Sequence, residues 1–359
     1  MVGEPLSVID AAGEVVGAAP DIPDADVARL YRAMLQLRLL DERMLRLQRQ
    51  GRIGFYMTST GEEAEQLGSA YPLRPSDWVF PSYREPGTLL WRGYTLKDFL
   101  CQLMGNAESP DRGRQMPVHH TAKALNYVSI SSPVGTQIPQ AVGAALAARH
   151  RGRDDVALVY FGDGATSTGS FHVGLNFAGA LRAPAVFFCR NNGFAISVPT
   201  SRQTAARTIA QKALAYGMPG VLVDGNDLLA VVQVTTQAVE RARRGGGPTL
   251  IEARTYRMGA HSSSDDPSVY RDPAEAARWQ RLDPLERLRR YLGARGRWDA
   301  AQEERWRQEI TAAIGAALAA AEAVGPPPLG SIFEDVYAEL PAHLAAQRRE
   351  AEAGRVATR

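Results

Sequence analysis

Two short apolar runs, each ending in a polar turn, constrain this sequence more than any other feature. VALVYF at 156–161 leads into Gly-Asp-Gly at 162–164, and AVFFCR at 185–190 leads into Asn-Asn-Gly at 191–193. Both runs are rich in β-branched and aromatic residues, which is typical of buried parallel strands. Between them, residues 170–181 carry apolar side chains at helical spacing. The stretch therefore predicts a strand–helix–strand unit.

The two polar turns have the residue types of a metal and phosphate site. A right-handed crossover places the carboxyl ends of both strands at one edge of the sheet, where ligands of open α/β sheets bind. Asp163, Asn192 and the backbone carbonyl of Phe194 would then offer oxygen ligands of the kind that Mg²⁺ prefers. The glycine turn and the helix start after it can supply N–H groups to a diphosphate. Gly-Asp-Gly taken alone also fits an ordinary strand-to-helix turn, but the pair of turns is harder to explain by packing.

Charge, hydropathy and cysteine content indicate which partners and which compartment to expect. A formal net charge of +2 gives no reason to expect nucleic acid or an anionic membrane as a partner. No apolar run approaches the roughly 18 residues of a membrane helix. The two cysteines, Cys101 and Cys189, lie in apolar surroundings and have no metal-like spacing, so we expect buried thiols in a reducing compartment. The first twenty residues carry acids and no Lys or Arg, which argues against a targeting peptide. We therefore expect a cytoplasmic protein.

The pattern along the chain predicts an α/β fold, with a mostly parallel sheet flanked by helices. Residues 1–26 lack a sustained period and are expected to form an N-terminal arm. Residues 27–282 open with a long amphipathic helix and contain the strand-forming runs, so they are expected to form the binding domain. A further helix is expected around 205–216. Residues 283–359 are helical in pattern and are expected to form a C-terminal extension with a final apolar docking patch around 332–340.

Three further stretches could contribute to a site. The turn at 131–137 combines hydroxyls, glycine and a helix start, which suits an anion but also suits simple capping. The long loop at 105–124 holds His119 and His120, to which no role is assigned. The loop at 256–272 follows another strand and contains His261, so it could close over a site or merely connect elements.

Motifs throughout the chain resemble one known family. FYMTSTGEEA, SYREPG, GRQMPVHH, ISSPVGTQIPQAVGAA, YFGDGATSTG, FFCRNNGFAIS and TLIEARTYRMGAHSSSDDPSVYR are similar to motifs of the alpha subunit of the thiamine diphosphate-dependent, decarboxylating component of 2-oxo acid dehydrogenase complexes. The likeness covers about Tyr31 to Gln347, and SSSDD after the histidine is similar to the branched-chain type. It implies the thiamine diphosphate-binding fold, with this chain supplying the diphosphate and metal half of the site.

The resemblance also implies roles for particular residues. His261 is expected to act in catalysis, by steadying charge or moving protons near the cofactor's thiazolium. The implied Mg²⁺ ligands are Asp163, Asn192 and the Phe194 carbonyl, and a monovalent cation, K⁺, is implied at Ser131, Pro133, Thr136 and Gln137. The residues implied to bind thiamine diphosphate are Tyr83, Arg84, Ser132, Val134, Gly162, Asp163, Gly164, Ala165, Arg190, Asn192 and His261.

The implied reaction is oxidative decarboxylation of a 2-oxo acid, with transfer of the acyl group to a lipoyl group on a partner acyltransferase. This is the 3-methyl-2-oxobutanoate dehydrogenase activity of branched-chain amino acid catabolism. A beta subunit is expected to complete the site in an α₂β₂ heterotetramer, because the cofactor's aminopyrimidine needs a carboxylic acid that this family takes from the beta chain. Pyruvate or acetoin as the acyl donor remains an alternative. A second alternative is that the chain is a non-catalytic subunit that serves assembly.

Overall fold

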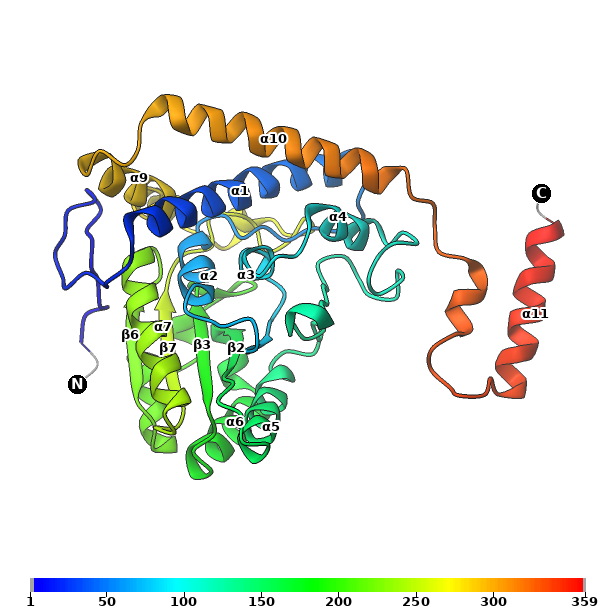
Figure 1. Cartoon of the computed structure of the whole chain (residues 1–359), viewed down its shortest axis with the longest axis horizontal. Coiled ribbons are helices and arrows are strands. Elements are labelled where there is room, and N and C mark those ends of the chain that lie inside the picture. Colours follow the sequence, from blue (N-terminus) through cyan, green and yellow to red (C-terminus); the bar gives the residue numbers. More distant parts are fainter. Residues whose placement is uncertain (1–2, 358–359) are drawn as a thin grey trace.

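The two apolar runs form the centre of a parallel β-sheet in the computed structural model, which describes residues 3–357 (Figure 1). Strands β2 (Ala157–Gly162) and β3 (Ala185–Asn191) pair in parallel, with Gly162 opposite Arg190. Every residue of β3 is buried, as expected for a strand covered on both faces. Residues 1–2 of the predicted arm and 358–359 of the predicted extension lie outside the described range.

Five strands make up this sheet in the described part of the chain, and all neighbouring pairs are parallel. The predicted α/β fold with a mostly parallel sheet is therefore confirmed. A short antiparallel pair, β4 (Phe194–Ala195) and β5 (Val198–Pro199), stands apart from the sheet, directly after the second polar turn. From edge to edge the main sheet has the order β1 (Trp78–Phe80), β2, β3, β7 (Thr249–Arg254) and β6 (Gly220–Asp224).

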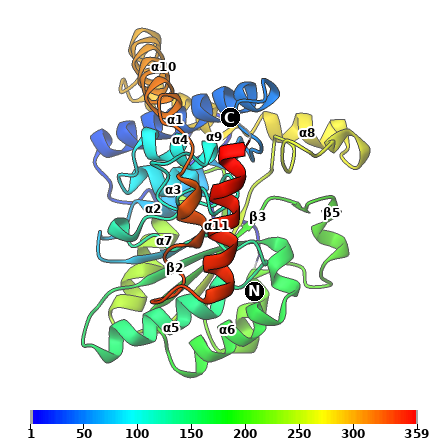
Figure 2. The same cartoon turned by 90° about the vertical axis from the view of Figure 1, so that its right-hand side faces the viewer.

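Helices cover both faces of the sheet (Figure 2). Tyr160 and Phe188 point into one hydrophobic core with helices α2 (Glu63–Ala70) and α7 (Leu228–Arg243). Their strand neighbours Phe161 and Phe187 point into a second core on the other face. That second core is closed by α5 (Gln137–His150) and by α6 (Gly169–Ala180), whose buried side chains include Phe171, Leu175 and Ala178. The crossover helix predicted from this spacing is present.

The long helix predicted after the N-terminal arm is α1 (Asp24–Arg49), and α10 packs along it (Figure 1). The arm itself runs beside the sheet edge, where Leu6 pairs with Val223 and the Val8 N–H donates to Asp227 at 2.6 Å. The division of the chain at 26 and 282 stays a prediction. The other helices are α3 (Pro86–Trp91), α4 (Leu96–Met104), α8 (Pro273–Gln280), α9 (Pro284–Ala294), α10 (Ala300–Glu322) and α11 (Ala342–Ala357).

Short 3₁₀ turns fill several connections. One of them, η4, corrects an expectation, because a helix was predicted over 205–216 and only its second half is helical, with 3₁₀ geometry. Thr204 to Thr208 instead form a loop stabilised by the Gln211 side chain, which accepts from the backbone of 207 and 208. The 3₁₀ segments are η1 (Lys123–Leu125), η2 (Asp163–Ser167), η3 (Thr200–Arg202), η4 (Ala210–Tyr216), η5 (Pro267–Val269) and η6 (Leu329–Phe333).

The C-terminal segment stands away from the sheet domain (Figure 1). Helix α11 packs against η6, and Arg112 and Arg114 of the long loop form ion pairs with Asp335. Ile332 and Val336 are 64% and 71% exposed, so the predicted apolar patch is present on the surface of this segment. Within residues 3–357, no helix is both long and apolar enough to cross a lipid bilayer.

Candidate active site

The two polar turns meet at the carboxyl ends of β2 and β3. Asp163 follows β2 directly and Asn192 follows β3, and both line a cavity of about 450 Å³. Gly164 is required by close approach, because a Cβ at this position would come within 2.8 Å of the Ala195 Cβ. The parallel register of the strands thus brings together two turns that are a full crossover apart in the sequence.

The lining of this cavity includes all the residues expected to bind the cofactor. They come from the turn after β1, the turn before α5, the two strand ends and the loop after β7. Their convergence is what the implied roles require, while the roles themselves stay predictions. The lining also contains Ser82, Ser131, Gly135, Gln137, Phe161, Thr168, Phe194, Ala195, Ile196 and Arg257.

The three expected Mg²⁺ ligands differ in the hydrogen bonds that they already make. Burial raises the pKa of Asp163, while the side chain of Gln203, which donates to its Oδ2 at 2.5 Å, opposes that rise. Asn192 donates through Nδ2 to the Glu62 carboxylate at 2.8 Å, so its Oδ1 is left as an acceptor. The Phe194 carbonyl accepts from Arg257 Nη1 at 3.2 Å. Two side-chain oxygens therefore suit a hard cation, and the third oxygen is shared with a guanidinium.

The turn expected to hold a monovalent cation is compact. Thr136 Oγ1 donates to the Pro133 carbonyl at 3.0 Å, and Gln137 Nε2 donates to the Tyr160 carbonyl at 2.8 Å. Ser131 and Gln137 line the cavity. The four residues lie close together in sequence, and the Pro133 carbonyl already accepts a hydrogen bond from Thr136. The cation site stays a prediction. Elsewhere among the described residues, no three His, Cys, Asp or Glu side chains gather to hold a metal ion.

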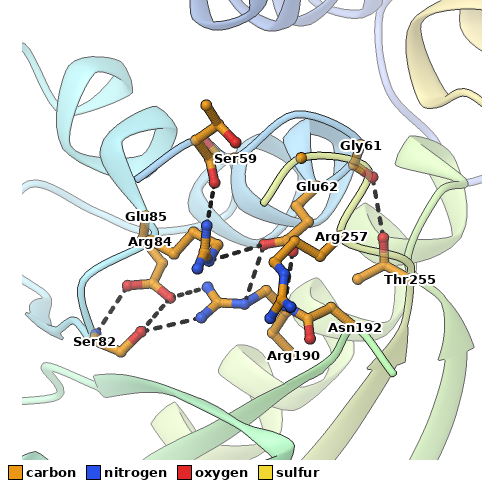
Figure 3. Close-up of polar contacts among 12 residues, drawn as sticks. Ser59, Gly61, Glu62, Ser82, Arg84, Glu85, Arg190, Asn192, Thr255 and Arg257 are labelled. Carbon is orange, nitrogen blue, oxygen red and sulfur yellow. Dashed lines mark hydrogen bonds and ion pairs between the residues drawn. The ribbon is translucent and has the colours of Figure 1, made fainter. Parts of the chain in front are cut away.

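Buried arginines that line the cavity are paired with buried carboxylates (Figure 3). Arg190 forms an ion pair with Glu85, which also accepts from the Ser82 hydroxyl at 2.7 Å. Arg84 donates to the backbone carbonyls of Thr58 and His261. Each guanidinium is thus held in place by fixed acceptors, with its charge at the edge of a cavity that can take an anion.

His261 is held neutral beside these arginines. Burial, followed by the charges of Arg84 and Arg257, lowers its pKa to about 3. Arg84 Nη2 lies 3.3 Å from its Nδ1, and since a guanidinium can only donate, Nδ1 accepts and the ring proton lies on Nε2. Of the two expected roles for His261, the geometry therefore favours hydrogen bonding or proton transfer over the contribution of a positive charge.

The loop that carries His261 is fastened to its neighbours. Ser263 N donates to the Tyr56 carbonyl at 2.9 Å, and Arg271 donates to the Gly259 carbonyl at 2.7 Å. Asp265 accepts from the His261 backbone N–H and from the Tyr270 hydroxyl, both at 2.6 Å. Of this fastened loop, Arg257 and His261 line the cavity, and closure of the loop over the site stays a prediction.

Several site residues were not identified from the sequence. His119, left without a role, does not line the cavity but places Nε2 2.7 Å from the Oγ of Ser132, which does. Arg257 follows β7 at the same sheet edge as the other ligands, a signal that could have identified it. Glu62 and Glu85 are buried acids. The one sequence signal for a buried charge cluster is the run of acids in GEEAE at 61–65, which leads into a helix whose residues are all buried.

Comparison with known proteins gives consistent matches. A family model described as the dehydrogenase E1 component matches residues 31–329. The mitochondrial 2-oxoisovalerate dehydrogenase subunit alpha of Caenorhabditis elegans is 46% identical over 350 residues, which is 96% of this chain and 81% of the relative. The subunit alpha from Homo sapiens is 46% identical over 344 residues, 95% of this chain and 77% of the relative. The subunit alpha 2 from Arabidopsis thaliana is 43% identical over 343 residues, 95% and 73% of the two chains.

One expectation fails against these matches. The relatives are named as mitochondrial proteins, which contradicts the cytoplasmic location expected from the sequence. The physical reason is that buried free cysteines and a small net charge fit any reducing compartment and do not distinguish one from another.

The other comparisons agree with the motifs. The matched range includes both polar turns, the arginine wall and the His261 loop, and the relatives are of the branched-chain type expected from SSSDD. A chain that carries these elements on a doubly covered parallel sheet, and that the family model spans from 31 to 329, belongs to the dehydrogenase E1 component family.

Proposed function

We propose that this chain is the alpha subunit of a thiamine diphosphate-dependent dehydrogenase that oxidatively decarboxylates branched-chain 2-oxo acids. The observation that carries the proposal is the cavity in which Asp163 and Asn192 face a wall of buried arginines beside His261. Membership of the family implies thiamine diphosphate, and the names of the relatives support 2-oxoisovalerate (3-methyl-2-oxobutanoate) as the substrate class.

The residues present fit a diphosphate with its metal ion. Arg84 and Arg190 would bind the anionic oxygens, and the backbone around Gly162 and Gly164 would lie against them. Asp163 and Asn192 would hold Mg²⁺, with the Phe194 carbonyl as a third ligand once Arg257 yields it. When bound, the cofactor supplies the carbanion that attacks the keto carbon and releases CO₂.

The protein's own contribution is position and control of protons. The neutral His261 would offer its Nε2 proton to an oxygen of the substrate in the cavity, close to Tyr83, whose ring centroid lies 6.0 Å from that of His261. Ser132, which lines the cavity, is hydrogen-bonded from behind by His119. The fastened 256–272 loop would exclude water from this side of the cavity.

A beta subunit would complete the site in an α₂β₂ assembly. Asp163 is the one carboxylate among the described residues that line the cavity, and metal binding uses it. The acid that the cofactor's aminopyrimidine needs would therefore come from the partner chain, and the acyl group would pass to a lipoyl group of an acyltransferase. A monovalent cation at Ser131, Pro133, Thr136 and Gln137 would brace the turn before α5.

The experiment is calorimetric titration of thiamine diphosphate, with and without Mg²⁺, into this chain alone and into the chain co-expressed with its beta subunit. We expect Mg²⁺-dependent binding, and tighter binding in the pair. Turnover by the reconstituted pair then tests the acyl donor. It is measured as CO₂ release from 3-methyl-2-oxobutanoate and pyruvate, and as cleavage of the bond between the two oxygen-bearing carbons of 3-hydroxybutan-2-one, which carries no carboxyl group. Faster turnover of pyruvate or acetoin would replace the branched-chain assignment, and no cofactor binding in either form would favour a non-catalytic assembly subunit.

A further inference from the structure

We propose that Glu62, a buried carboxylate behind the cavity, is a positioning residue that orients the Asn192 amide toward the metal and aligns Arg190 beside it. Glu62 does not line the cavity, and no motif of the sequence assigned it a role. It lies directly before α2 with no exposed surface, and Figure 3 shows its carboxylate between three residues of the site. The inference rests on the proposed function, because it concerns the same metal site.

The contact with Asn192 decides which way the amide faces. Glu62 Oε1 lies 2.8 Å from Asn192 Nδ2, and a carboxylate offers only acceptors, so the NH₂ end of the amide must face Glu62. The oxygen end then lies on the other side, where Oδ1 accepts from Phe194 N at a long 3.4 Å and keeps capacity for a cation. Without Glu62, the amide could rotate and present its NH₂ group to the metal.

The second oxygen of the same carboxylate faces the arginines. Glu62 Oε2 lies 3.2 Å from Arg190 Nε and 3.9 Å from Arg84 Nε. Glu85 pairs with Nη1 of Arg190, so carboxylates lie on both sides of that guanidinium, and the contact with Glu62 is an ion pair without a hydrogen bond. Since all of these groups are buried, removing Glu62 would leave two buried guanidiniums with less compensating charge.

The backbone around Glu62 is itself fixed. Gly61 has a φ of +93°, and a Cβ at this position would come within 2.8 Å of the Tyr256 carbonyl oxygen. Thr255 Oγ1 donates to the Gly61 carbonyl at 3.1 Å, and Gln66 Nε2 donates to the Glu62 carbonyl at 3.2 Å. The carboxylate is therefore presented from a turn tied to the end of β7, which is the kind of support that keeps a metal ligand in one orientation.

The test measures metal binding directly. Mn²⁺ is titrated into the chain co-expressed with its beta subunit and saturated with thiamine diphosphate, and free Mn²⁺ is measured by electron paramagnetic resonance. Glu62→Gln, whose amide can face Asn192 with either end, should raise the Mn²⁺ dissociation constant on the order of 10–100-fold. The matched control is Glu65→Gln, which replaces another fully buried carboxyl group, 3.9 Å from the same Arg190, that makes no contact with Asn192. Its Mn²⁺ affinity should stay within about 3-fold of wild type, by the usual size of indirect effects.

The outcomes separate this inference from the proposed function. A Glu62→Gln affinity equal to wild type, or an equal loss in both variants, would overturn the inference. If Glu62→Gln does not fold, as judged by circular dichroism, Glu62→Asp replaces it. Aspartate keeps the charge near Arg190 but cannot reach Asn192 from the same backbone position, and a wild-type Mn²⁺ affinity in that variant also overturns the inference. A wild-type chain that binds neither thiamine diphosphate nor Mn²⁺ even with its beta subunit refutes the proposed function instead.

Discussion

His120 provides a quantitative test of how the long loop beside the site is built. The side chain is 3% exposed, its ring stacks on Phe99 with centroids 4.4 Å apart, and Tyr94 contacts it edge-on. Neither ring nitrogen has a hydrogen-bond partner among the described residues. Burial lowers its pKa from 6.5 to about 3, with a smaller contribution from His119. The folded protein therefore holds a neutral imidazole as an aromatic packing residue.

The direction of the pH effect follows from these two pKa values. Between pH 6.5 and about 3, the unfolded chain binds a proton at His120 that the folded chain does not bind, so acid favours unfolding. The contribution to stability is fully present above pH 6.5 and is lost by about 1.4 kcal/mol per pH unit below it. At pH 5 the loss amounts to about 2 kcal/mol, a substantial part of the stability of an ordinary domain.

The perturbation is His120→Phe, which keeps an aromatic ring against Phe99 and removes the titrating group. Urea unfolding, followed by tryptophan fluorescence at pH 8 and at pH 5, gives the free energy of unfolding of both proteins. We expect the wild type to lose about 2 kcal/mol more than the variant between the two pH values. Because each protein is compared with itself at the two pH values, the cost of fitting the larger ring cancels, and so does the titration of groups that both proteins share. Equal losses in the two proteins would refute the reasoning.

Three further changes test the site. Gly164→Ala places a methyl group 2.8 Å from the Ala195 Cβ, so the melting temperature should fall with a loss of about 1–3 kcal/mol, and an unchanged melting curve contradicts the close approach. His261→Ala should lower turnover of the reconstituted pair, measured at saturating thiamine diphosphate, by roughly 100-fold or more, whereas unchanged turnover excludes a catalytic role. Arg257→Lys loses the fork that reaches two backbone carbonyls and the Tyr270 hydroxyl, so limited proteolysis should cleave the 256–272 loop faster than in wild type.

The elements around the polar turns could be predicted because their signals are local. The apolar runs of β2 and β3 and the helical spacing of α6 are each visible within a dozen residues, and parallel pairing then dictates that both turns share one edge. The motifs around Arg84 and His261 extended the same logic to residues that the sheet topology alone could not bring to the site.

The buried charge network could not be predicted, because it depends on packing between distant segments. Glu62, Arg84 and Arg190 meet through contacts that join α2, the turn after β1 and the end of β3, and nothing in any one segment shows the other two. The prediction of a helix over 205–216 was wrong for a related reason. Its composition suits a helix, but Glu252 on β7 accepts the Ala210 N–H at 2.8 Å and holds the chain in a different path.

The register of β2 against β3 has a consequence for how sequences of this kind can vary. Because Gly162 lies opposite Arg190 in a ladder of parallel backbone hydrogen bonds, the spacing of Asp163 and Asn192 is set by strand pairing and is independent of the chain length between them. Residues could be inserted or deleted at the end of α6, near Leu181 and Arg182, where the surface is exposed, without moving either ligand. A single residue inserted within β3 would instead turn Arg190 and its neighbours to the opposite face. The crossover therefore tolerates insertions and deletions, whereas strand β3 does not.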